Sequence, residues 1–286
     1  MTQQMLKTNT ILKRFKLILG CAALILIAFL STICLVTGLE IMGLKNDFLI
    51  NSIPRLTVGI ILLWGFKKRH PDVTIGLTKE GWVLGLVLGW PIYIGSAINF
   101  YESLESMQGM NKIMPTAVEY VLYIVQVIAI GVFEEGMLRG VVLNKMLIQW
   151  GNTRRGIYAS VAISSLLFGL IHLINLLSKP WLVVTTFTQV MYAFIIGIFF
   201  AAIYVRTRNL WVVIAFHALY DLGGCLDDLF IREISEKINP DISIMDGVMT
   251  LLPFMFFLVI ALFYLRKEKL EVQERDIDKE INRLEA

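Results

Sequence analysis

Long apolar stretches separated by short polar links make up most of the chain. A helix needs ~20 apolar residues to cross the hydrocarbon core of a bilayer. The stretches that qualify are 17–38, 49–66, 82–101, 116–149, 156–178, 181–205, 210–229 and 247–265. The second is the weakest, because Pro54 and Arg55 interrupt its outer end. The pattern predicts an all-α, polytopic membrane protein with about eight transmembrane helices.

The distribution of basic residues predicts the orientation of these helices. Cytoplasmic loops are enriched in Lys and Arg. With the N-terminus in the cytoplasm, the basic segments that lie inside are 67–69, 145–155, 206–208 and 266–269. The opposite loops contain few basic residues, and the loop at 227–246 is acidic. Lys7, Lys13, Arg14 and Lys16 precede the first stretch without a small-residue cleavage site, so it reads as an uncleaved span. We expect both termini in the cytoplasm.

Composition bears on the class of protein and its partners. A chain that is 57% hydrophobic and 17% charged is typical of a membrane protein. We expect one transmembrane domain at 1–265, with its core at about 116–229, and a charged cytoplasmic tail at 266–286. No basic patch or phosphate-binding glycine loop indicates nucleic acid, so the lipid bilayer is the expected surrounding. The short loops favour a bacterial plasma membrane, and no feature predicts an oligomeric state.

Ionisable residues lie deep inside the apolar stretches. Glu134, Glu135 and Arg139 fall within six positions of the fourth stretch, and His172 and His217 occupy later ones. A charged side chain at the bilayer centre costs ~2.5–3.5 kcal/mol on insertion scales, so such residues are functional candidates by default. Together they supply groups for acid–base chemistry inside a membrane.

Depth and helical phase suggest which of these groups meet. Glu134 lies 16 residues before Trp150 and His172 lies 16 after Gly156, which places both ~24 Å from the intervening turn. His217 and Asp221 share one face of the seventh stretch, and a tilted helix would bring them beside that pair. We expect Glu134, His172 and His217 to converge within about one water molecule.

The two adjacent glutamates have different predicted roles. Glu135 and Arg139 are four residues apart in the favourable order for a helical ion pair, so we interpret them as structural. Glu134 points about 100° away around the helix and has no cation within its own helix. Glu134 is therefore the carboxylate available for chemistry.

These motifs resemble the signatures of the CPBP family, the CAAX proteases and bacteriocin-processing enzymes, also called the Abi family. The matching residues are Glu134-Glu135-x-x-x-Arg139, then Phe168-x-x-x-His172, then His217-x-x-x-Asp221, in family order. The resemblance implies an eight-helix intramembrane endopeptidase whose polar cavity opens toward the cytoplasmic leaflet. It implies catalytic roles for Glu134 as the base that activates water, His172 as its partner on that water, and His217 at the oxyanion.

The last motif position departs from the better-understood members of the family, which have Asn where this chain has Asp221. An ionised Asp cannot donate a hydrogen bond to an oxyanion. Asp221 would have to be protonated, as an apolar site can enforce, or orient His217 as an acceptor. We favour orientation.

The chemistry is open to two mechanisms. In one, a desolvated glutamate and two histidines hydrolyse an amide without a metal. In the other, Glu134, His172 and His217 bind Zn²⁺ with an open fourth position. The chain has no HExxH motif that would require zinc, so we prefer the metal-free mechanism. Zn²⁺ is the cofactor that the other mechanism would need.

The leading function is an intramembrane endopeptidase that acts on a membrane-associated peptide or protein. The alternative is a non-catalytic immunity or signalling scaffold with the same fold, including bacteriocin immunity. A proton-coupled transporter is a third class, but it predicts inverted repeats that the sequence does not show.

Overall fold

The computed structural model describes residues 3–76, 79–110, 112–231 and 241–266, and these residues are helical with no strand. Most of the predicted tail at 266–286 lies outside the described residues. The α-helices are α1 (Gln3–Ile41), α2 (Asp47–Arg69), α3 (Lys79–Leu88), α4 (Trp90–Ser106), α5 (Ala117–Glu135), α6 (Asn144–Trp150), α7 (Arg154–Ile171), α8 (Asn175–Ser178), α9 (Val183–Thr207), α10 (Leu210–Gly224), α11 (Asp227–Phe230) and α12 (Ile244–Tyr264). A π-helical segment, η1 (Gly136–Leu143), follows α5, and a 3₁₀ turn, η2 (His172–Ile174), follows α7.

The helices confirm an all-α polytopic membrane protein. Six helical segments of the described chain are long and apolar enough to cross a membrane. The helices α3 and α4 pass the same test as a pair bent by 53°. The apolar helix α10 has 15 residues, about 22 Å of rise, which is shorter than a ~30 Å hydrocarbon core. The predicted number of eight crossings therefore stays a prediction.

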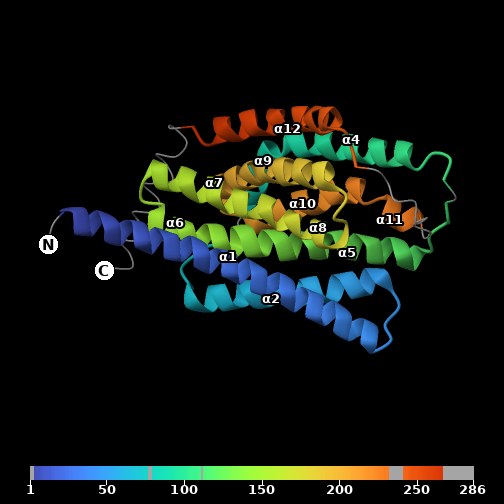
Figure 1. Ribbon diagram of the computed structural model, residues 1–286, viewed down its shortest axis with the longest axis horizontal. Helices are drawn as coiled ribbons and strands as arrows, with labels where there is room; N and C mark the ends of the chain where they lie inside the picture. The colour runs from blue at the N-terminus through green and yellow to red at the C-terminus, as the bar shows by residue number, and fades with distance from the viewer. Residues whose placement is uncertain (1–2, 77–78, 111, 232–240, 267–286) are drawn as a thin grey trace.

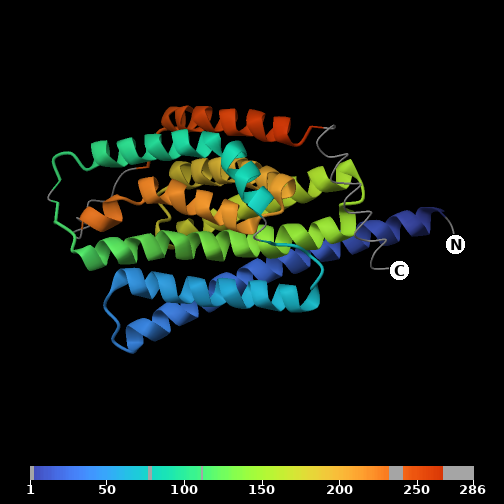
Figure 2. The same cartoon turned by 180° about the vertical axis from the view of Figure 1, so that it is seen from behind.

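The helices form a bundle with a buried centre (Figures 1 and 2). The pair α1 and α2 forms one flank, and α4 and α12 lie on the opposite flank. The helices α5, α9 and α10 lie between them, and every residue from 195 to 205 of α9 is buried. The start of α1, the turn between α6 and α7 and the end of α12 lie at the same end of the bundle (Figures 1 and 2).

A tight connection sets the position of α10 against α9. Arg208 ends α9 in the left-handed conformation (φ 51°), and Asn209 follows it directly. The Asn209 side chain accepts hydrogen bonds from the backbone N–H groups of Trp211 and Val212, which caps α10. The two-residue turn therefore returns the chain beside α9 and fixes the level at which α10 carries His217.

Four predicted stretches are not single regular helices, and the one at 210–229 is interrupted after Gly224. The stretch at 116–149 changes to a π-helix after Glu135, and the stretch at 156–178 changes to a 3₁₀ turn at His172. The stretch at 82–101 bends at Gly89, where a Cβ atom would lie 2.0 Å from the ring of Phe216. Proline near the start of α4 removes a helical donor at that bend. Pro54, in contrast, lies inside a continuous α2.

Asp241 joins the segment before α12 to the start of α9. Its carboxylate accepts hydrogen bonds from the backbone and hydroxyl of Thr185, at 2.8 and 2.7 Å, and from the backbone of Val184 and Ile242. A carboxylate at a helix N-terminus is favoured by the unpaired N–H groups there. Although desolvation opposes the charged form, these hydrogen bonds hold the pKa of Asp241 below its usual value.

Replacing Asp241 with Asn is expected to lower thermal stability at neutral pH. Because the folded pKa lies below the unfolded value of about 3.9, the stabilisation is present above that value. It is lost as the pH falls through the folded pKa. Thermal unfolding in detergent from pH 7 to pH 3 should show the two proteins converging at the acid end. The control is Asp72→Asn, at an exposed loop residue, and a constant difference across the range would contradict the assignment.

Candidate active site

The site is built where α5 changes to η1. Glu134 and Glu135 are the last residues of α5, and the eight-residue π segment follows at once. Such segments are rare and often mark functional positions. The side-chain amide of Asn144 donates to the backbone carbonyls of Arg139 and Gly140, at 3.1 and 3.0 Å, and to the Tyr204 hydroxyl at 2.7 Å. The Asn144 side chain is therefore a buried donor for two backbone carbonyls of the π-helical segment.

Glycines let the neighbouring backbones approach at the level of the site. A Cβ atom on Gly131 would lie 2.9 Å from the carbonyl oxygen of Ile214, so α5 and α10 are in backbone contact. A Cβ atom on Gly169 would lie 2.6 Å from the carbonyl oxygen of Val190, so α7 and α9 are equally close. Gly131 lies three residues before Glu134, Ile214 three before His217, and Gly169 three before His172. Small residues therefore hold these helices together where the polar groups meet.

Glu135 and Arg139 form a fully buried ion pair. The Arg139 Nη1 atom donates to Glu135 Oε1 at 2.9 Å, and the two side chains are 1% and 0% exposed. Arg139 Nη2 donates to the carbonyl of Gly197 at 2.8 Å. The guanidinium also lies over the rings of Phe168 and Phe200, at 5.0 and 5.8 Å. Removing one partner of such a pair leaves an uncompensated buried charge, so the pair fixes α5 and η1 against α9.

Glu135 also holds His217, a contact that the sequence analysis did not anticipate. The same oxygen that binds Arg139 accepts from His217 Nδ1 at 2.8 Å. A carboxylate is an acceptor, so Nδ1 carries the proton in this bond. The ring stacks on Phe200 at 5.8 Å. Glu135 therefore keeps a proton on Nδ1 and sets the orientation of His217.

The opposite nitrogen of His217 faces two further carboxylates. His217 Nε2 lies 3.4 Å from Asp221 Oδ2 and 3.7 Å from Glu134 Oε2. The side chains of Glu134 and Asp221 are 20% and 22% exposed, whereas Glu135 is closed off completely. The structure therefore places Glu134 and Asp221 together at the open side of the imidazole. Glu135 orients His217 through Nδ1, and Asp221 lies at the other ring nitrogen, so the orienting role expected for Asp221 stays a prediction.

His172 enters the site through a break in α7. Its Nδ1 atom donates to the carbonyl of Phe168 at 3.1 Å, and its backbone N–H bonds to Gly169 and Leu170 instead. This exchange explains why the helix tightens into a 3₁₀ turn at His172. Because Nδ1 carries the proton, Nε2 of the neutral ring keeps a free lone pair.

His172 is a neighbour of the site rather than a direct partner of Glu134. Its ring packs on Phe168 at 5.3 Å, and the same phenyl ring lies 6.2 Å from His217. Glu134 and His172 interact electrostatically, but within the described residues no hydrogen bond or ion pair joins them. The close approach expected among Glu134, His172 and His217 is thus found between Glu134 and His217. His172 reaches this pair through the Phe168 ring, which both histidines contact.

Arg55 is a charged neighbour that the sequence analysis noted only as an interruption of the second stretch. Its guanidinium Nη1 donates to the backbone carbonyl of Asn51 at 2.8 Å and to the Asn51 side chain at 2.9 Å. It also interacts electrostatically with Glu134 and Asp221. An arginine inside a transmembrane stretch is a functional candidate by default, so the signal was present in the sequence.

A catalytic zinc site would need about three side-chain ligands placed close together. Across the described residues, no group of three or more His, Cys, Asp or Glu side chains could hold one. The residues proposed for zinc are Glu134, His172 and His217, and the last two use Nδ1 for other bonds. Their Nε2 atoms are not used in these bonds, so binding of Zn²⁺ by the three residues stays a prediction.

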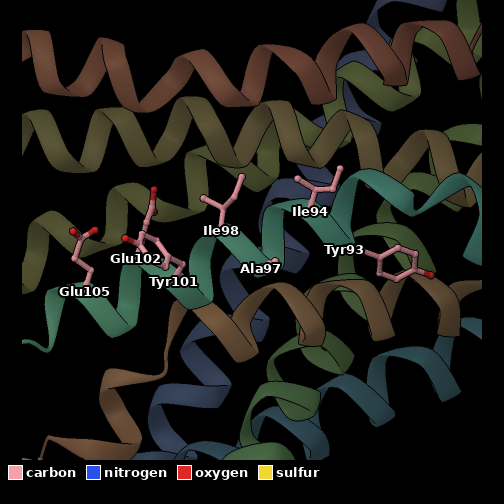
Figure 3. A pocket seen from close by; sticks show the side chains of 7 residues that line it. All are labelled: Tyr93, Ile94, Ala97, Ile98, Tyr101, Glu102 and Glu105. Carbon is pink, nitrogen blue, oxygen red and sulfur yellow. The ribbon is translucent and has the colours of Figure 1, made fainter.

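A groove of about 580 Å³ lies elsewhere, along α4 (Figure 3). Its lining residues are Tyr93, Ile94, Ala97, Ile98, Tyr101, Glu102 and Glu105. None of the candidate residues contributes to it. Figure 3 shows that these side chains project from one helix of the outer flank. The groove is therefore separate from the candidate active site.

Comparison with known proteins identifies the region that holds the site. Residues 116–223 match a family model described as type II CAAX prenyl endopeptidase Rce1-like. No curated protein and no solved structure matches the chain. The matched region begins at the cap of α5 and ends within α10, so it contains every candidate residue except Arg55. The region that holds the site is therefore similar to the Rce1-like CAAX endopeptidase family, and the chain has the helices of a multi-pass membrane protein.

Proposed function

We propose that this chain is an intramembrane endopeptidase in which Glu134 and His172 activate a water molecule to hydrolyse a peptide bond. The observation that carries the proposal is the contrast between two adjacent carboxylates. Glu135 is enclosed by Arg139 and His217, whereas Glu134 is partly open and faces His217 Nε2. A partly desolvated carboxylate beside imidazoles suits a general base near neutral pH.

The reaction follows from the positions of the protons. Water held between Glu134 and the free lone pair of His172 Nε2 gives a proton to Glu134 as its oxygen attacks the scissile carbonyl carbon. The carbonyl π electrons move to oxygen, and the resulting oxyanion accepts a hydrogen bond from Nε2 of His217, which in this step is an imidazolium with a proton on each ring nitrogen. Glu134 then passes its proton to the leaving amine as the C–N bond breaks. Donors aimed at a developing oxyanion are commonly worth ~2.7–4 kcal/mol.

Peptide-terminus profiling tests this function. Membranes of cells that express the wild type, Glu134→Gln or His172→Ala at matched levels are compared, with Glu105→Gln as the control because Glu105 is exposed on α4. Termini that occur with the wild type and the control, and not with the other two, would establish a protease and identify its substrate. Identical termini in all four would leave the immunity or signalling scaffold as the function.

The proposed mechanism uses no metal. Treatment of the purified protein with a chelator such as EDTA should leave the cleavage rate unchanged. Loss of activity that Zn²⁺ restores would replace this mechanism with a metalloprotease one.

Arg55 is proposed as a positioning residue. Glu134 and Asp221 face the same imidazole nitrogen and interact with each other, and Arg55 offsets their charge. Arg55→Gln is expected to lower kcat about ten-fold, equivalent to ~1.4 kcal/mol, with little change in KM, whereas Arg55→Lys should keep most of the rate. The control is Arg69→Gln, at an exposed residue ending α2. An unchanged kcat for Arg55→Gln, measured on the identified peptide, would remove Arg55 from the site.

A further inference from the structure

The burial of residues around the site differs sharply between its two sides. Toward the α6–α7 turn, every residue from 136 to 144 and from 195 to 205 is buried. Away from that turn, residues 171–176 and 219–222 are half-buried, and Glu134 and Asp221 are about one-fifth exposed. The site is therefore enclosed toward the α6–α7 turn and less enclosed toward the other end of the bundle.

The closed side is sealed by a polar network that has no access to solvent. Arg139 bonds to Glu135 and Gly197, and Asn144 bonds to Tyr204. Arg139, Asn144 and Tyr204 are 0–1% exposed. Because these groups bond to one another in a dry interior, with Glu135 Oε2 left without a hydrogen-bond partner, the network acts as the floor of the site. A peptide could not enter through it without breaking these bonds.

Half-buried polar groups lie on this less enclosed side. Asn175 and Gln189, from α8 and α9, are hydrogen-bonded at 2.8 Å and are both half-buried. Arg55 on α2 is half-buried as well and interacts with Asp221. Polar side chains at membrane depth that face a bundle interior mark substrate pathways. The approach to Glu134 therefore runs from this end.

Loop charges identify the two ends. The closed end carries the basic residues Lys67, Lys68, Arg69, Arg154, Arg155, Arg206, Arg208 and Arg266. In the described loops at the open end, the basic residues are Lys45, Lys112 and Lys179, alongside Asp227, Asp228 and Asp241. By the bias of Lys and Arg toward cytoplasmic loops, the closed end is cytoplasmic. The family resemblance implied the opposite opening, toward the cytoplasmic leaflet.

We propose, on the basis of the protease function above, that the site opens to the extracytoplasmic face of the membrane. Its substrate is then a peptide segment that has already crossed the bilayer, as in an exported peptide or the outer part of a membrane-anchored protein. A prenylated protein held at the cytoplasmic surface could reach Glu134 only through the sealed floor.

Cysteine accessibility tests the direction of opening without requiring activity. In a background with Cys21, Cys34 and Cys225 replaced, single cysteines are placed by Asp221→Cys in the site, Leu177→Cys at the open rim and Gln149→Cys near the α6–α7 turn. Leu177 and Gln149 are exposed, and Asp221 is partly exposed. A membrane-impermeant maleimide should label Leu177→Cys and Asp221→Cys in intact cells at least about ten-fold faster than in inverted vesicles, because it reacts with water-exposed thiolate. Gln149→Cys should show the reverse.

Labelling of Asp221→Cys from inverted vesicles alone, or from neither side, would overturn the proposal, as would labelling of Gln149→Cys in intact cells. A second measurement separates this result from the protease function. The segment found by terminus profiling is displayed on either face of the membrane, in cells with the wild type or Glu134→Gln. Cleavage of the outward segment alone supports the proposal, and cleavage of the inward one overturns it. If neither is cut while the labelling pattern holds, the protease function fails and the outward opening stands.

Discussion

A purified Glu134→Gln protein is expected to lose about 10²–10⁴-fold in cleavage rate, the range typical of removing a general base, while unfolding at the temperature of the wild type. The amide keeps the shape of the carboxylate but cannot take a proton from water. Stability should hold because Glu134 is partly exposed and His217 Nε2 lies 3.7 Å from its carboxylate, beyond a hydrogen bond.

The neighbouring substitution Glu135→Gln is the matched control for this result. It makes the same chemical change one residue further on, where the carboxylate is fully buried and binds both Arg139 and His217. That protein should unfold at a lower temperature. Rates and unfolding curves of both variants, measured in the same detergent, separate a chemical role from a structural one. Equal activity in Glu134→Gln and the wild type would end the proposed mechanism.

Replacing Arg139 with Met should destabilise the protein by about 3–5 kcal/mol, the cost of leaving a buried partner charge unpaired. The variant loses the bonds to Glu135 and Gly197 and the contacts with two phenylalanine rings. Denaturant titration of the purified protein measures the loss. The double variant Glu135→Met/Arg139→Met should be less destabilised than Arg139→Met alone, because both charges are removed. Additive losses in the double variant would show that the two side chains do not act as a pair.

The sequence predicted the helices and most of the site because both follow from hydrophobicity. Apolar stretches of membrane-spanning length became helices, and the polar residues inside them turned inward, since lipid is a poor solvent for charge. Glu134 and His217 lie close together, although depth alone paired Glu134 with His172 and reached His217 only through a tilted helix. Arg55 interrupts the apolar pattern of its stretch, so hydrophobicity marks it as a break and not as a charged group that needs a partner.

Features that depend on contacts between helices were not predictable from spacing. The bond between Glu135 and His217 joins residues 82 apart in sequence, and helical phase within α5 could assign Glu135 to Arg139 alone. The π segment depends on a buried donor from Asn144. The break at His172 depends on which group takes the Phe168 carbonyl. In the last two cases a side chain bonds to a backbone carbonyl of the helix, and hydrophobic periodicity does not predict such bonds.

The π segment has a consequence for how this chain compares with its relatives. A π turn closes on the fifth residue instead of the fourth, so it takes up one more residue than an α turn at the same place. A homologue with an uninterrupted α-helix in place of η1 would align only with a one-residue gap between positions 136 and 143. Without that gap, the helix face of α6 would be misassigned by about 100°. A one-residue difference in length within this segment therefore indicates whether a homologue has the π turn or a regular α-helix there.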